Sequence, residues 1–145
     1  MIDYRILHDP AELEEVVNLE ISVWGLNPRN AVPTAILHVM ALGGGLIMGA
    51  YDGTRLVGLL ICLVVKRGNE VFLWSHMTGT HPDYQNQGIG LALKRFQRRW
   101  ALDNGVPLVL LADALADGVR TAARVNSRVL PFNLPQARAR LSGGF

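Results

Sequence analysis

Gln85-Asn86-Gln87-Gly88-Ile89-Gly90 is the stretch that decides the fold, because it lies between a strand pattern and a helix pattern. Residues 70–80 before it are rich in β-forming side chains, and residues 87–104 after it have a helical period. Glycines here let a ligand approach the backbone closely, and several amides point the same way at a helix start. The stretch, called the 85–90 loop below, therefore predicts a cradle for a pyrophosphate. The alternative is a glycine turn that only lets the helix and the strand pack.

Two other phosphate-binding motifs do not fit the residues around this loop. A dinucleotide-binding fingerprint requires a third glycine at position 93, which is Leu93, and it usually follows the first strand of its fold. A P-loop requires Gly-Lys-Ser or Gly-Lys-Thr, and neither tripeptide occurs in the chain.

The sequence on both sides of the loop predicts an α/β domain with a mixed sheet. Runs of β-forming residues bounded by turn residues indicate strands at 2–7, 46–50, 56–65, 70–80 and 107–112. Helical periods and helix-start signals indicate helices at 10–24, 33–42 and 87–104. The predicted order is therefore β-α-α-β-β-β-α-β. Residues 119–129 also fit a helix, and Pro131 and Pro135 interrupt the sequence that follows.

The helix at 87–104 is expected to have one apolar and one basic face. The apolar face, expected to be buried, consists of Ile89, Leu93, Phe96 and Trp100. The basic face, expected to be exposed, consists of Lys94, Arg95, Arg98 and Arg99. The first helix is expected to begin with Asp9 as its cap, Pro10 at its first position and Glu12 closing a capping box.

Composition fits one compact domain over residues 1–145, because 50% of the 145 residues are hydrophobic and 18% are charged. The charge is uneven. Residues 1–93 carry 5 basic and 9 acidic side chains, whereas residues 94–145 carry 9 basic and 3 acidic ones. The basic half fits an anionic partner such as a phosphorylated cofactor or a nucleic acid, or simply a solvated helix face.

Cellular location and metal content are predicted from what the sequence lacks. Cys62 is the single cysteine, so an intrachain disulfide is excluded and secretion is not indicated. The sequence has neither the order of a signal peptide nor about 20 continuous apolar residues. We expect a soluble, cytoplasmic protein without a membrane partner. Four histidines without clustered cysteines or carboxylates predict no metal site.

A family resemblance rests on the pattern Gln-x-x-Gly-x-Gly, preceded by a strand and by His81-Pro82-Asp83-Tyr84. This pattern resembles the acetyl-CoA-binding motif of the GNAT superfamily of N-acetyltransferases. Residues 49–58 look like the hairpin between the second and third strands of that family, and the order of elements agrees. The resemblance covers residues 2–112 and implies a GNAT-like acyl-CoA N-acyltransferase fold with an abbreviated or divergent C-terminal end.

The resemblance implies a site for acetyl-CoA or a related acyl-CoA. The pyrophosphate would be held by the amides of Gln87, Gly88, Ile89 and Gly90, with Gln85 and Asn86 nearby. The fourth strand would separate from the fifth at a bulge. That separation would free backbone groups of Met77, Thr78, Gly79 and Thr80 to bind the pantetheine arm. Lys94 and Arg95 would lie either near cofactor phosphates or on a solvated face.

The implied reaction is direct attack of a neutral primary amine on the thioester, which requires a base for the ammonium and an acid for the departing thiolate. Glu70 and His76 are the candidate bases, because they lie on the fourth strand, where this family often has its base. His76 has the better intrinsic pKa for neutral pH. The alternatives are that Glu70 is a turn residue and that His76 is a structural strand histidine. We expect His38 and His81 to be structural.

The C-terminal part departs from the family pattern. Ser127 stands where the family has a tyrosine acid, and Pro131 replaces a glycine. The open explanations are a truncated or divergent end, or completion of the sheet by a second subunit in a homodimer.

The alternatives to an enzyme are a non-catalytic acyl-CoA-binding module and a nucleic-acid-binding domain. The latter lacks any supporting motif, so we expect no nucleic-acid partner. We expect the acceptor to be a small molecule or an N-terminal amine, with Trp24, Trp74 and Met40 as candidate pocket residues or core residues.

Overall fold

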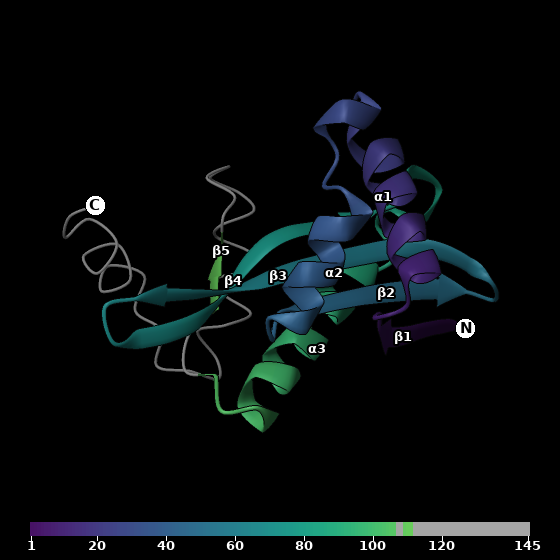
Figure 1. Ribbon diagram of the computed structural model, residues 1–145. Helices are drawn as coiled ribbons and strands as arrows, with labels where there is room; N and C mark the ends of the chain where they lie inside the picture. The colour runs from purple at the N-terminus through teal and green to yellow at the C-terminus, as the bar shows by residue number, and fades with distance from the viewer. Residues whose placement is uncertain (107–108, 112–145) are drawn as a thin grey trace.

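The computed structural model describes residues 1–106 and 109–111 of the chain (Figure 1). The strands are β1 (Ile2–Ile6), β2 (Leu46–Asp52), β3 (Arg55–Arg67), β4 (Glu70–Thr80) and β5 (Val109–Leu111). The helices are α1 (Pro10–Trp24), α2 (Thr34–Leu42) and α3 (Ile89–Asp103), with short 3₁₀ turns at Pro28–Asn30 and Pro82–Tyr84. The predicted β-α-α-β-β-β-α-β order is confirmed. The helix expected at 119–129 lies outside the described residues.

The strands form one sheet in chain order, from β1 to β5. The first four strands pair antiparallel, and β5 pairs parallel with β4, which confirms the predicted mixed sheet. Antiparallel neighbours need only a short turn, but a parallel neighbour needs a crossover connection. The α3 helix is that crossover, so the 85–90 loop that starts it lies at the end of β4.

Helices cover both faces of the sheet. α1 and α2 lie on one face and α3 on the other (Figure 1). Leu59 of β3 packs in the cluster under α1 and α2, whereas its neighbour Leu60 packs with Leu93 of α3. Six consecutive residues of β2 are buried, because helices cover this strand on both faces too. Such doubly covered strands are continuously apolar, as the sequence of 56–65 predicted.

The register between β3 and β4 is interrupted by a bulge at His76. Ile61 pairs with Met77 and Cys62 pairs with Ser75, so His76 is an extra residue on β4. An extra residue shifts the alternation of side chains between the two faces. Consequently Ser75 meets α3, as its contact with Lys94 shows, whereas Met77 packs under α1 and α2.

The buried face of α3 differs from the prediction: Phe96 is exposed and Trp100 is half-buried, whereas Gln97 and Ala101 are buried. Ile89, Leu93, Gln97 and Ala101 are the buried residues of this helix. Phe96 is 44% exposed and stacks on Tyr4, with 5.2 Å between the ring centroids. Lys94, expected on the exposed face, turns inward to hydrogen-bond with Ser75 and Gln97. Gln97 can be buried and Lys94 half-buried because their polar atoms are hydrogen-bonded, which an apolar period cannot anticipate.

Among the helices of the described residues, none is long and apolar enough to cross a membrane. Within the same residues, no group of three or more His, Cys, Asp or Glu side chains could hold a metal ion.

Candidate functional site

The 85–90 loop joins the 3₁₀ turn Pro82–Tyr84 to α3 through two residues in the left-handed region. Asn86 has φ 62° and Gly88 has φ 80°. Asn86 is the one non-glycine residue with positive φ in the described part of the chain. Asparagine and glycine tolerate this region best, which explains why they occupy these two positions. Residues 85–88 are exposed, so the backbone of the turn is open to a ligand.

The N-terminus of α3 is open as well. Gly88 is the cap residue, and within the described residues no side chain hydrogen-bonds to the cap or contributes an acid to the first turn. The first amides of a helix have no carbonyl partner within the helix, and together they carry a partial positive charge. A Cβ added at Gly88 would meet nothing within 4 Å. The residues present therefore fit a pyrophosphate group.

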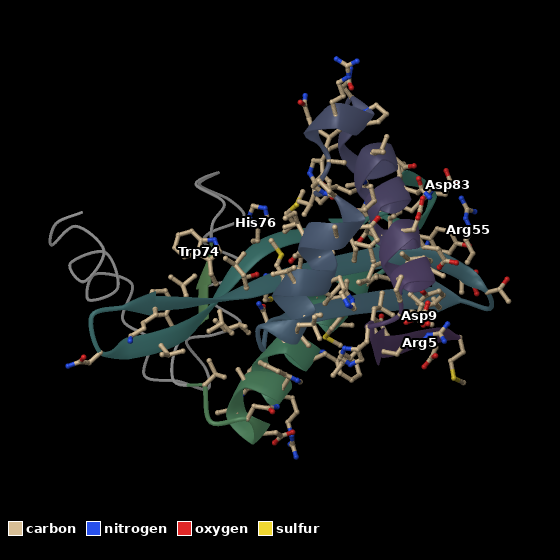
Figure 2. All side chains as sticks on the ribbon, viewed as in Figure 1. Arg5, Asp9, Arg55, Trp74, His76 and Asp83 are labelled. Carbon is tan, nitrogen blue, oxygen red and sulfur yellow. The ribbon has the colours of Figure 1, made fainter. Side chains whose placement is uncertain are left out.

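The loop is tied to the turn between β2 and β3. Tyr84 Oη donates to Asp52 Oδ2 at 2.8 Å, and Arg55 Nη2 lies 3.0 Å from His81 Nε2. Arg55 also forms an ion pair with Asp83, with 3.7 Å between Nη2 and Oδ2. The two residues lie close together in Figure 2. These contacts give His81 a structural role, as the sequence suggested. Arg55 and His81 also border a cavity of about 330 Å³ between α1 and the start of β3.

β4 has an unpaired edge next to the loop. In the described part of the chain, β5 pairs with β4 only from Leu73 to Ser75. The bulge at His76 follows directly, and residues 77–80 pair with β3 alone there. Their amides and carbonyls on the other edge are free for a ligand. Gly79 is required by packing, because a Cβ there would lie 2.8 Å from the Trp24 ring.

The two candidate bases lie at different places on β4. His76 is half-buried at the bulge, beside residues 77–80, and its side chain projects on the same side of the strand as Trp74 (Figure 2). Glu70 begins β4 at the hairpin turn, opposite Arg67. Six residues of extended strand span about 20 Å. The structure thus brings His76, but not Glu70, next to the open edge.

The sequence did not indicate the contacts of Lys94. Its Nζ donates to Ser75 Oγ at 2.5 Å and to Gln97 Oε1 at 3.2 Å. Burial lowers the pKa of Lys94 to about 8, opposed by the nearby Cys62. Burial also raises the pKa of the Cys62 thiol to about 11. The one sequence signal for this contact is the spacing of Lys94 and Gln97, because side chains three positions apart lie on the same face of a helix and can hydrogen-bond.

Ser127 and Pro131, the departures from the family pattern, lie outside the described residues. The expectations attached to them stay predictions.

Known proteins share this architecture. The profile of the acetyltransferase (GNAT) family matches residues 14–124. A solved aminoglycoside acetyltransferase from an uncultured soil metagenomic sample, in complex with sisomicin, superposes with a TM-score of 0.71 at 18% identity, covering 86% of each chain. A ribosomal-protein-alanine N-acetyltransferase from Brucella melitensis biovar Abortus 2308 gives 0.63 at 17% identity, covering 86% of this chain and 89% of that one.

An acetyltransferase from Trypanosoma brucei gives a TM-score of 0.68 at 16% identity, covering 86% of this chain and 91% of that one. The search of curated proteins finds no match. At these identities the solved structures establish the fold. The family profile spans most of the 145 residues, including α1, the bulged β4 and the 85–90 loop. The chain belongs to the GNAT acetyltransferase family.

Proposed function

We propose that this GNAT acetyltransferase transfers an acetyl group from acetyl-CoA to a primary amine by direct attack of the amine on the thioester. One observation carries the proposal. The open N-terminus of α3, preceded by Asn86 and Gly88 at positive φ, lies beside the unpaired edge of β4. The pyrophosphate of acetyl-CoA fits the open start of α3, and its amide-containing pantetheine arm fits the edge of β4.

The acyl donor is held mainly by backbone groups in this proposal. The amides of Gln87, Gly88, Ile89 and Gly90 bind the pyrophosphate, supported by the side chains of Gln85 and Asn86. Backbone groups of residues 77–80 hydrogen-bond the pantetheine arm and orient the thioester carbonyl. Backbone amides suit this task because the strand and the helix hold them in place before the substrate arrives.

The acceptor must lose a proton to become a nucleophile. We assign the base to His76, whose position at the bulge is adjacent to the proposed thioester-binding residues. Histidine is the side chain most often used as a general base near neutral pH. Glu70 is the second candidate, but its backbone begins at the other end of β4 and it would have to act through water.

A second candidate function is a non-catalytic acyl-CoA-binding module. Ser127 favours it, because a serine is a poor general acid where the family has a tyrosine. Both candidates predict the same cofactor loop, so only turnover separates them.

The acceptor class, the homodimer and the cytoplasmic location remain proposals. A small-molecule amine and a protein amino terminus are both consistent with the family, since the similar structures include an aminoglycoside acetyltransferase and a ribosomal-protein-alanine N-acetyltransferase.

Calorimetry with acetyl-CoA tests the donor site, and we expect saturable binding. No heat of binding at high micromolar acetyl-CoA would contradict both candidate functions. A thiol-release assay over aminoglycosides, polyamines and peptides with free amino termini then tests turnover. Binding without thiol release on any of these amines would favour the binding module. In an active enzyme, His76→Ala should remove the rise of kcat/KM with pH on the acidic side, and Glu70→Gln should leave that rise in place.

A further inference from the structure

The last residues of α1 lie on the open edge of β4. A Cβ built on Gly79 would lie 2.8 Å from Trp24 Cη2 and 3.0 Å from Val23 Cγ1, so both side chains rest on the backbone of Gly79. Gly79 belongs to residues 77–80, which pair with β3 alone in the described part of the chain. Gly25, with φ 61°, ends the helix directly after Trp24. The Trp24 ring therefore lies at the end of α1, beside the edge proposed to bind the pantetheine arm.

Met77 continues this apolar surface toward His76. Met77 and Val23 both pack, half-buried, against the core cluster under α1 and α2. Alternate residues of a strand share a face, so Met77 lies next to Gly79 on the face that Trp24 covers. Val23, Trp24 and Met77 are called the Trp24 wall below. Trp24 is 41% exposed, so part of its ring is available for contact with a ligand.

His76 lies on the same face of the sheet as the Trp24 wall. Trp74 pairs with Leu63, which alternates with Ile61 of the cluster under α1 and α2. Trp74 and His76 project on the same side of β4 (Figure 2). The candidate base and the Trp24 wall thus border one stretch of β4, where the thioester is proposed to lie.

This face of the molecule is poor in negative charge. Between Glu20 and Asp83 the sequence contains two acids, Asp52 and Glu70. Asp52 accepts a hydrogen bond from Tyr84 at the β2–β3 turn, and Glu70 begins β4, nine residues or about 30 Å of strand before Gly79.

The acids of α1 do not reach the Trp24 wall either. Glu20 is 1% exposed and its carboxylate accepts from the Val32 amide. Glu15, the nearest exposed acid along α1, precedes Trp24 by nine residues, which is about 13 Å along the helix axis. The sequence of residues 112–145 contains five arginines and two aspartates, so its composition adds positive rather than negative charge.

We propose that the acceptor is a primary amine on an apolar, aromatic body without a second cationic group, and that the Trp24 wall binds this body. The inference rests on the proposed function and names its substrate class. The substrate ammonium gives one proton to His76, and its nitrogen then bonds to the acyl carbon. The C–S bond breaks with its electron pair on sulfur. The second proton that the nitrogen releases passes through water to the thiolate, so an N-acetylamine and CoA thiol form.

A polycationic acceptor is the sharpest contrast. One of the similar structures is an aminoglycoside acetyltransferase in complex with sisomicin, a compound with several ammonium groups. On this chain, every additional ammonium group would lose water beside apolar side chains without gaining a carboxylate. An aromatic body instead gains contact with the indole ring and loses no charge hydration. Trp24 is in this sense a specificity-determining residue rather than part of the chemistry.

The test compares kcat/KM for 2-phenylethylamine, ethylamine and sisomicin. In the wild-type protein 2-phenylethylamine should exceed ethylamine about 10- to 100-fold, as expected for burial of a phenyl ring, and it should exceed sisomicin. Trp24→Ala should lower the ratio of 2-phenylethylamine to ethylamine about 10-fold, and Trp24→Phe should largely restore it. A merely structural tryptophan would change both amines equally and leave the ratio unchanged. Phe96→Ala is the matched control, because Phe96 is 44% exposed on α3, across the sheet.

A second variant tests the charge argument. Trp24→Glu places a carboxylate on the wall and should raise kcat/KM for sisomicin relative to 2-phenylethylamine at least about 10-fold. An unchanged ratio of 2-phenylethylamine to ethylamine in Trp24→Ala, or a wild-type preference for sisomicin, would overturn the inference.

Failure of the proposed function gives a different result. Thiol release with none of these amines would contradict the proposed catalysis. Calorimetry of 2-phenylethylamine with the CoA-saturated protein then decides the inference separately. We expect binding that Trp24→Ala weakens about 10-fold, and no binding to the wild-type protein would overturn the proposed acceptor class.

Discussion

The two long helices, α1 and α3, are both 15 residues long, but their N-termini differ in how they are capped. In α1, the Asp9 side chain accepts a hydrogen bond from the Ala11 amide at 2.8 Å, Pro10 removes one donor, and Glu12 adds an acid to the first turn. In α3, Gly88 is the cap, and the described residues offer its first turn neither a capping side chain nor an acid. The first helix satisfies its own terminus, whereas the terminus of the second has no such partner among the described residues and is the proposed pyrophosphate site.

If the start of α3 binds the pyrophosphate as proposed, the difference is a place where the fold gives up stability for binding. A side-chain cap contributes about 1 kcal/mol to a helix, and an acid in the first turn adds a few tenths. α3 lacks both contributions at the one place where a pyrophosphate would supply them. The same helix also holds Lys94 half-buried, with its pKa lowered by the loss of solvent, a second feature that costs stability.

Making the start of α3 resemble that of α1 should have the largest effect on binding. Gly90→Asp places a carboxylate in the first turn, where a new Cβ would lie 3.8 Å from Thr80 Oγ1, an ordinary contact. Repulsion of the pyrophosphate should raise the Kd for acetyl-CoA at least about 100-fold, while the helix keeps or gains stability. Calorimetry and thermal melting measure the two quantities. Gly90→Asn is the neutral control, and equal losses in both variants would mean that space rather than charge matters.

Removing the half-buried charge of Lys94 from α3 should stabilise the protein. Lys94→Met should raise the free energy of unfolding at pH 7 by about 1–3 kcal/mol. The pKa of Lys94 is about 8 in the folded protein and 10.5 normally. Between these values the unfolded chain binds more protons, so the free energy of unfolding of the wild-type protein should rise with pH. Urea unfolding across this window should show the rise in the wild-type protein and a flatter profile in the variant.

Releasing the 85–90 loop from the β2–β3 turn should have a smaller effect on binding. Tyr84→Phe removes the hydrogen bond to Asp52 but keeps the ring packed against the hydrophobic core that includes Ile89 and Leu93 of α3. The loss should raise the Kd for acetyl-CoA about 3- to 10-fold, in line with one hydrogen bond. An unchanged Kd, measured by calorimetry beside an Asp52→Asn variant, would show that the loop holds its shape without this contact.

Opening the start of α1 should change stability alone. Asp9→Ala removes the cap of α1 and should lower the free energy of unfolding by about 1 kcal/mol. The affinity for acetyl-CoA should stay the same, because Asp9 caps α1, which covers the face of the sheet opposite to α3 (Figure 1). Denaturant unfolding and calorimetry on the same preparation make the comparison. A weakened affinity would show that the two helix starts are not independent.

Features set by neighbouring residues could be predicted. The Asp9-Pro10 start of α1 and the strand–loop–helix setting of the 85–90 loop follow from local backbone preferences, so the sequence was sufficient for them. The alternation of strands and helices followed from hydrophobic periods, which also depend on neighbours in the chain.

Features that depend on contacts distant in sequence could not be predicted. Phe96, expected to be buried, is exposed, and Gln97 is buried because it finds Cys62 and Lys94 as partners, 35 and 3 residues away in sequence. Glu70 and His76 look equivalent as residues of one strand, and only the register with β3 shows that His76 alone occupies the bulge.

The sequence by itself determined the family, the order of elements and the open start of α3, because each rests on residues adjacent in the chain. Tertiary contacts were needed to show that the inner face of α3 holds a half-buried cation, that His76 lies at the bulge in β4, and that Glu70 begins the other end of that strand. The physical reason is that burial and register are set by partners on other strands and helices, and a period along one segment carries no information about those partners.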